Sequence, residues 1–196
     1  MMRRFTVGRA MLFQILSLLL EVVCGLIGGA CLLRCYMQYL SIPMSARSGN
    51  PLARFVFVLT DWLVLPLRRV VPSLGPLDTS SLLGAYLMEL LQFVVLWTLT
   101  EFLAPWGSVF WLALFGLLRL AISALTGLVI VYALMSWIQG QNLLAHVIER
   151  LVTPPLTPIR RWLPLMGGFD LSPLVLLLLL QVLAIVLGHV QASVLF

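Results

Sequence analysis

The chain has 196 residues, of which 62% are hydrophobic and only 10% are charged, and its twelve basic side chains are all arginines. A soluble domain carries about 25% charged residues, so this composition excludes a soluble enzyme and a soluble nucleic-acid-binding protein. The formal charge of +5 therefore indicates contact with a membrane surface, with no nucleic acid as partner.

The first ten residues carry Arg3, Arg4 and Arg9 and precede an apolar run that begins at Met11. The run is too long for the apolar core of a secretory signal, and no small-residue cleavage site follows it cleanly. We therefore interpret residues 1–10 as an N-terminal extension and the following run as a membrane anchor.

Four apolar blocks are long enough to cross a bilayer, which takes about 20 mostly apolar residues. They are Met11–Leu33, Ser81–Ala104, Ser108–Ile138 and Leu171–Val194. The predicted fold is therefore all-α, a polytopic membrane protein with about four transmembrane helices. The third block is longer than needed and could instead begin with an interfacial or broken segment around Pro105, Trp106 and Gly107.

An internal repeat organises the chain. When residues 50–82 are laid over residues 142–174, an offset of 92, 12 of 33 positions are identical. Most identities are Pro, Gly, Arg, Asp or Ser, which a chance likeness between apolar helices would not produce. We expect a first repeat at residues 11–104 and a second at residues 108–196.

Each repeat is predicted to contain a short amphipathic helix that lies in the membrane interface. In the second copy, Asn142 is the expected N-cap, and His146, Glu149 and Arg150 lie on the polar side. The apolar side, at helical spacing, consists of Leu143, Leu144, Val147, Ile148, Leu151 and Val152. The first copy, residues 51–65, is more apolar and could dip deeper.

A motif, Pro-[Leu/Ile]-Arg-Arg-x-x-Pro-x-x-Gly-x-x-Asp-x-Ser, follows each amphipathic helix. Its copies contain Pro66, Arg68, Arg69, Pro72, Gly75 and Asp78, and then Pro158, Arg160, Arg161, Pro164, Gly167 and Asp170. The first proline is predicted to end the amphipathic helix, and the glycine permits a turn with positive φ.

The end of the motif is predicted to start the next transmembrane helix. In the second copy Ser172 is the expected N-cap, with Pro173 at the first helical position. Asp78 and Ser80 are expected to do the same in the first copy.

The motif has two interpretations. In the structural one it is an anchored loop, in which Asp78 or Asp170 pairs with its own arginines. In the functional one the arginine pairs face the headgroups and bind lipid phosphates or an acidic partner.

Four charged side chains lie within the apolar blocks, namely Glu21, Glu89, Glu101 and Arg119. Of these, we interpret Glu21, Glu89 and Arg119 as the intramembrane charges. At the upstream offset of 98, Glu21 aligns with Arg119, and an unpaired charge in hydrocarbon costs several kcal/mol. We therefore expect a Glu21–Arg119 ion pair between the two halves, with Glu89 as the competing partner of Arg119.

The same alignment pairs Gly25 with Ser123 and Gly29 with Gly127. Small residues four apart allow two membrane helices to approach closely. We expect these two faces to serve such contacts.

No enzyme signature is present, and no cofactor or metal site is expected. His146 and His189 are far apart, with no Cys or carboxylate at ligand spacing. The three cysteines, Cys24, Cys31 and Cys35, share one helix face and are interpreted as apolar filler.

The motif copies at residues 66–78 and 158–164, with Met135-Ser136-Trp137, resemble the bacterial YggT family, which has plastid relatives. The resemblance runs from about Met11 to the C-terminus, and members often begin near that position. It implies an inner-membrane protein linked to tolerance of osmotic stress in proteobacteria. Relatives elsewhere are linked to cytochrome assembly in plastids, or to cell division and nucleoid distribution. No catalytic residues are established for the family.

The arginine distribution predicts orientation. Three arginines, Arg3, Arg4 and Arg9, lie on the side of the termini. Eight lie on the motif side, namely Arg34, Arg47, Arg54, Arg68, Arg69, Arg150, Arg160 and Arg161. We expect cytoplasmic motif loops and periplasmic termini.

Two functions fit these features. The first is a non-enzymatic scaffold or assembly factor of the inner membrane that binds anionic lipids or a membrane-protein partner complex. The alternative is an oligomeric channel or transporter for an ion or osmolyte, lined by Glu21, Glu89 and Arg119. A homo-oligomer is compatible with both.

Overall fold

The computed structural model describes residues 2–44, 49–73, 75, 77–99, 106–137, 143–162 and 170–195. Their secondary structure is helical, which confirms the all-α prediction. The helices are α1 (Met2–Tyr39), α2 (Pro51–Val70), α3 (Thr79–Leu99), α4 (Trp106–Trp137), α5 (Leu143–Trp162) and α6 (Ser172–Leu195).

Four of the described helices are long and apolar enough to cross a membrane: α1, α3, α4 and α6. They match the four predicted blocks, so the chain is a multi-pass membrane protein. α4 is continuous from Trp106 through Gly107, so the broken segment considered there is not formed. Pro105 lies outside the described residues.

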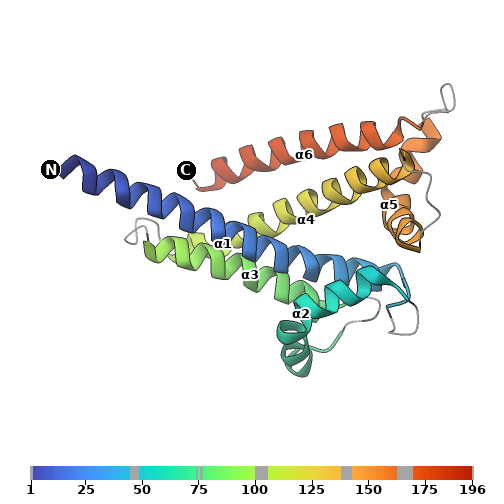
Figure 1. Cartoon of the computed structure of the whole chain (residues 1–196), viewed down its shortest axis with the longest axis horizontal. Coiled ribbons are helices and arrows are strands. Elements are labelled where there is room, and N and C mark those ends of the chain that lie inside the picture. The colour runs from blue at the N-terminus through green and yellow to red at the C-terminus, as the bar shows by residue number, and fades with distance from the viewer. Residues whose placement is uncertain are drawn as a thin grey trace.

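The membrane helices pack in series. α1 packs mainly on α3, α3 also packs on α4, and α4 packs on α6. Figure 1 shows α2 and α5 together at one end of the molecule, with both chain termini at the other end. The two halves therefore repeat the same helix order in the same direction.

The buried core also repeats. Cys31, Val64 and Ala85 form a cluster between α1, α2 and α3. Their positions in the second half are Val129, Leu156 and Leu177, at offsets of 98, 92 and 92. Val129 and Leu156 belong to the buried cluster between α4, α5 and α6, and the partly buried Leu177 packs against it. This agreement shows that corresponding side chains do the same packing in both halves.

A third cluster joins the halves at the motif end. Met37, Ile42, Ala53 and Leu151 pack together from α1, the segment after it, α2 and α5. Met37 and Leu151 are fully buried. Burial of large apolar side chains contributes roughly 1.5–3 kcal/mol each, so this cluster is a substantial link between the repeats.

The prediction that Pro66 and Pro158 end the amphipathic helices is wrong. α2 continues to Val70, and α5 continues to Trp162 through Pro154, Pro155 and Pro158. A proline inside a helix removes one N–H and leaves the carbonyl four residues earlier without its helical donor. For Pro155 that carbonyl is Leu151 O, and the Tyr36 hydroxyl of α1 donates to it at 2.9 Å.

The helices after the two motifs begin earlier than predicted, at Thr79 and at Ser172. Asp78 caps α3, accepting from the Ser81 backbone N–H at 3.4 Å and its hydroxyl at 2.8 Å, so Ser80 is inside the first turn. α6 already includes Ser172, whose N–H donates to Asp170 Oδ1 at 2.9 Å. In both copies the side chain that accepts a backbone N–H at the helix start belongs to the aspartate and not to the serine.

Asn50 caps α2 by accepting from the N–H groups of Leu52 and Ala53. Its counterpart Asn142, the expected cap of α5, lies outside the described residues.

Candidate functional site

The first motif closes on itself through Arg68 and Asp78. The last turn of α2 carries Arg68, and the chain reverses through Gly75, whose φ of +62° favours glycine as predicted. Arg68 Nη2 then lies 2.6 Å from Asp78 Oδ2. The carboxylate therefore holds both the helix before the turn and the helix after it.

A third charged residue, Arg34 of α1, joins this pair inside the protein. Its Nη1 donates to Asp61 Oδ1 at 2.7 Å and to the Thr60 hydroxyl at 2.8 Å. Its Nε is 3.8 Å from Asp78 Oδ2, and its guanidinium stacks over the Phe57 ring at 4.8 Å.

The network is buried at its centre and exposed at its edge: the side chains of Arg34 and Asp78 are 4% and 0% exposed, whereas those of Arg68 and Asp61 are 40% and 42% exposed. Two arginines and two aspartates balance in charge, and this pairing offsets the cost of burying Arg34 and Asp78. The network joins α1, α2 and α3 at the motif end of the first repeat.

The second motif forms the equivalent Arg–Asp ion pair, but there the pair is partly exposed to solvent. Arg160 Nη2 lies 2.7 Å from Asp170 Oδ2, at side-chain exposures of 37% and 29%. Arg160 also donates to the Tyr132 hydroxyl at 2.9 Å. Tyr132 is at the position equivalent to Arg34, at an offset of 98, so a tyrosine hydroxyl stands where the first repeat has a third charge.

Both aspartates favour the charged form. Burial alone would raise the pKa of Asp78, but hydrogen bonds from Ser81 and Arg68 outweigh it and hold the pKa below its ordinary value. For Asp170, hydrogen bonds from Ser172 and Arg160 likewise outweigh burial and lower the pKa. These contacts are those of the structural interpretation of the motif.

The second arginine of each pair is different. Arg69 and Arg161 are exposed, and neither has an ion-pair partner within the part of the chain that the structure describes. Each motif thus uses one guanidinium to fix its own turn and leaves one on the surface. Of the remaining motif residues, Pro72 is exposed, while Pro164 and Gly167 lie outside the described residues.

The predicted Glu21–Arg119 ion pair is not formed. Both side chains are exposed, and no described nitrogen–oxygen pair within 4.0 Å joins Arg119 to Glu21 or to Glu89. Glu89 instead lies 4% exposed on α3, against Gly116 of α4, where an added Cβ would meet its carboxylate. Glu21 and Arg119 are close enough to act on Glu89 electrostatically.

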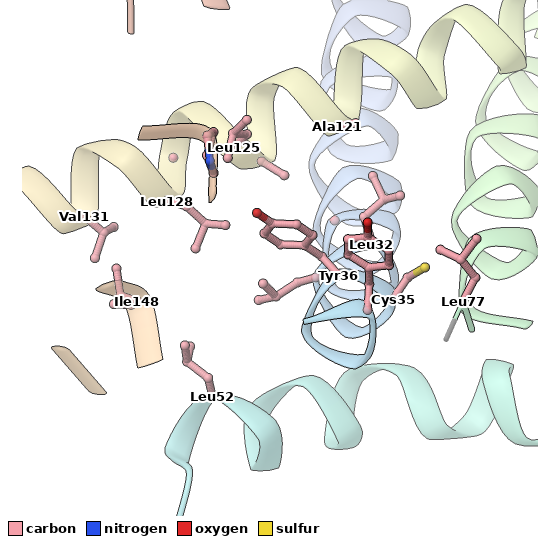
Figure 2. Close-up of a pocket in the computed structure, with 16 residues that line it drawn as sticks. Leu32, Cys35, Tyr36, Leu52, Leu77, Ala121, Leu125, Leu128, Val131 and Ile148 are labelled. Carbon is pink, nitrogen blue, oxygen red and sulfur yellow. The ribbon is translucent and has the colours of Figure 1, made fainter. Parts of the chain in front are cut away.

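The small-residue faces of α1 and α4 produce only part of the expected contact: an added Cβ at Gly25 would lie 4.0 Å from Leu120 of α4. An added Cβ at Gly29 or Gly127 would meet no atom within 4 Å, whereas at Gly28 it would approach Leu120 to 2.9 Å. The helices touch at Gly28 and diverge beyond it. Gly29 and Gly127 instead line a cavity of about 600 Å³ between the two halves (Figure 2).

The cysteines are buried and free. Among the described residues no group of three or more His, Cys, Asp or Glu side chains is placed to hold a metal ion.

Comparison with known proteins assigns the chain to a family. The sequence profile of the CCB3/YggT family matches residues 13–99 and 111–191, one segment in each half. The chain belongs to the CCB3/YggT family. No solved structure matches it.

Related bacterial proteins align with most of this chain. An uncharacterized protein named YggT from Escherichia coli K12 is 39% identical over 85% of this chain and 86% of its own length. A Vibrio alginolyticus protein is 35% identical over 75% and 81%, and a Haemophilus influenzae protein is 32% identical over 76% and 78%.

Sequence reasoning missed three contact residues of this CCB3/YggT protein. Arg34 was counted only as a charge beside the first span, although its place between Leu33 and Cys35, in an apolar helix, was a signal of a buried partner. Tyr36 and Tyr132 gave no signal, because a tyrosine near a helix end is equally typical of the membrane interface.

Proposed function

We propose that the protein is a non-enzymatic scaffold or assembly factor of the bacterial inner membrane, which binds anionic lipid headgroups or an acidic partner at one membrane surface. One observation carries the proposal: each motif ties its first arginine to its own aspartate and leaves Arg69 or Arg161 exposed without an ion-pair partner among the described residues. Guanidinium groups bind phosphate and carboxylate oxygens through paired hydrogen bonds.

The place of the motifs supports this function. α2 and α5, which carry Arg69 and Arg161 in their last turns, lie at the same end of the molecule (Figure 1). We propose that this end is cytoplasmic, because eight arginines lie on the motif side against three on the other. A linked role in tolerance of osmotic stress follows from the family resemblance.

Lipid selectivity tests the proposal. The purified protein is reconstituted in mixed phosphatidylglycerol and phosphatidylcholine, and the retained lipids are counted by native mass spectrometry. We expect R69Q/R161Q to lose the preference for phosphatidylglycerol. The double variant R54Q/R150Q removes the same charge from exposed arginines of α2 and α5 outside the motifs and should weaken this preference less.

Equal effects of the two variants would mean general surface charge and no motif site. A fixed protein partner that copurifies with the native chain and is lost in R69Q/R161Q alone would assign the site to an acidic partner. For the osmotic role, a strain that lacks the protein should grow at high osmolarity with the native chain and fail with R69Q/R161Q.

The burial of Glu89 favours a second candidate function. It lies inside α3 without an ion pair within 4.0 Å among the described residues, and intramembrane carboxyl groups often mark transport routes. An oligomeric ion or osmolyte pathway then uses Glu21, Glu89 and Arg119. Solute flux into reconstituted liposomes that E89Q abolishes would support transport, and absence of flux would exclude it.

A further inference from the structure

The cavity between the two halves has the shape of a site for a long apolar molecule. Its volume of about 600 Å³ lies within the range of roughly 300–1,000 Å³ that is typical of ligand sites. Figure 2 shows Tyr36 and Leu32 of α1, Leu125 and Val131 of α4, and Leu52 of α2 around it. The lining contains no charged side chain.

The depth of the cavity matches one leaflet. Its walls run from Gly29 to Tyr39 on α1 and from Ala121 to Val131 on α4. Ten residues of helix are about 15 Å long, which is half of a hydrocarbon core of about 30 Å. The cavity therefore extends from the motif end toward the middle of the membrane.

Both ends of this cavity suit a lipid. Tyr39 and Val131 line it and are 54% and 41% exposed, so the cavity opens to the surrounding lipid. A half-exposed tyrosine at the end of a membrane helix is typical of the headgroup level. The deeper wall includes four small residues, Gly29, Ala121, Ala124 and Gly127, which leave space between the larger side chains.

The charge beside the cavity selects the lipid class. α2 and α5 supply lining residues Leu52, Ile148 and Pro155. The same two helices carry four exposed arginines that have no ion-pair partner among the described residues, namely Arg54, Arg69, Arg150 and Arg161. A lipid headgroup that contains a phosphate and carries a net negative charge fits this surface.

We propose that one acyl chain of an anionic phospholipid occupies the cavity, with its phosphate among the arginines of α2 and α5. The lipid then packs between the two repeats as a structural ligand. This inference rests on the proposed function, because the same arginines select the headgroup, but it adds a chain site that the headgroup proposal does not require.

Photocrosslinking tests the chain site. The full chain is reconstituted in phosphatidylcholine that contains phosphatidylglycerol with a diazirine in its acyl chain, and is then irradiated and digested with trypsin. Since the basic residues are all arginines, cleavage yields a fragment of residues 120–150, with the α4 wall, and one of residues 162–196, with α6 and no lining residue. The second fragment is a control for ordinary lipid contact.

We expect adducts to be several-fold more frequent on residues 121–131 than on α6, and more frequent than with a phosphatidylcholine probe of the same chain. G127L fills the cavity without meeting another atom at its Cβ and should remove this excess. A124L is a second filling variant. V186L adds bulk at an exposed position of α6 and should change nothing.

Three outcomes would overturn the proposal. Equal labelling of the two fragments, or labelling that G127L and A124L leave unchanged, would mean that no chain is held there. Equal labelling by the phosphatidylglycerol and phosphatidylcholine probes would mean that the cavity does not select an anionic lipid. Exclusion of both probes, together with a dimer that G127L dissociates in native mass spectrometry, would assign the cavity to a second copy of the chain.

The proposed function fails on a different readout. If R69Q/R161Q retained the phosphatidylglycerol preference while G127L removed the crosslinks, the cavity site would stand with Arg54 and Arg150 as its headgroup contacts.

Discussion

Asp78 and Asp170 hold equivalent places in the two motifs, but their surroundings differ. Asp78 is fully buried between Arg34 and Arg68, whereas Asp170 and Arg160 are about one-third exposed. A buried charge that loses its partner costs far more than an exposed one, because water cannot replace the lost contact. The two repeats therefore provide an internal comparison of the same ion pair in two environments.

The first prediction concerns the charge of Asp78. Asparagine caps helices as well as aspartate does, so D78N keeps an acceptor for the Ser81 N–H, but it removes the charge and replaces Oδ2, the acceptor of the Arg68 hydrogen bond, with an NH2 group. Arg34 keeps Asp61 but loses its second carboxylate, and we expect a loss of about 3 kcal/mol in unfolding free energy. D170N should cost about 1 kcal/mol or less. Denaturant titration in detergent micelles measures both, and equal losses would contradict the difference in burial.

The pH dependence of stability follows from the lowered pKa of Asp78. The folded carboxylate binds a proton less readily than the unfolded one, so its contribution is complete above the ordinary aspartate pKa of about 3.9. It is lost as the pH falls through the lower folded value. Unfolding titrations between about pH 5 and pH 3 should show declining stability in the native protein.

The matched control for this pH series is D78N, which lacks the titrating group. Its stability should decline less steeply over the same interval. An identical slope in the two proteins would mean that other carboxyl groups dominate acid unfolding.

At the scale of helices, α5 depends on α1 for a hydrogen bond. Pro155 cannot donate to Leu151 O, and the Tyr36 hydroxyl does so instead across the boundary between the repeats. Leu151 is fully buried, so a carbonyl without a donor there costs about 1–3 kcal/mol. Because Pro155 leaves the Leu151 carbonyl without its helical donor, this carbonyl can accept a hydrogen bond that links α5 to α1.

A double-mutant cycle tests this dependence. Y36F should destabilise the native protein by about 1–3 kcal/mol, but it should have little effect in P155A, where the restored N–H donates to Leu151 O. Y39F removes an exposed hydroxyl with no described hydrogen bond and should change stability by less than about 0.5 kcal/mol. Additive effects of Y36F and P155A, measured by denaturant titration, would exclude the replacement.

The helices also show how far sequence reasoning reaches. Four apolar blocks and a repeated polar motif were enough for the membrane helices, because length and hydropathy decide that question. The Asp–Arg pairing within each motif was one of two open interpretations. The position of Arg34 in an apolar helix indicated a buried partner, but the identity of its partners could not be predicted, because it depends on how α1 packs against α2.

The cavity could not be predicted for a different reason. Small residues four apart permit close contact but do not require it, and contact at Gly28 leaves Gly29 and Gly127 apart. Pro155 of α5 illustrates a similar reason: its penalty is local, and the Tyr36 hydroxyl of another helix donates to the carbonyl that it frees. Both cases depend on tertiary contacts between segments more than 80 residues apart.

For the whole molecule, the direction of the repeats has a consequence for topology. Parallel repeats bring α2 and α5 to one end and both termini to the other (Figure 1). Any orientation in the membrane must therefore place both motifs on one side. Arginines near the spans are retained in the cytoplasm during insertion, and they are concentrated on the motif side.

The last prediction is this orientation, tested on the full chain. Alkaline phosphatase fused to the C-terminus should be active, because the enzyme folds only in the periplasm. A cysteine at the exposed position Thr153 of α5 should resist a membrane-impermeant maleimide in intact spheroplasts and react after lysis. The native cysteines are buried, and the parent protein is the labelling control. A fusion active only as a cytoplasmic reporter, with T153C labelled from outside, would reverse the orientation. Labelling of T153C on the same side as the C-terminus would contradict the parallel arrangement of the repeats itself.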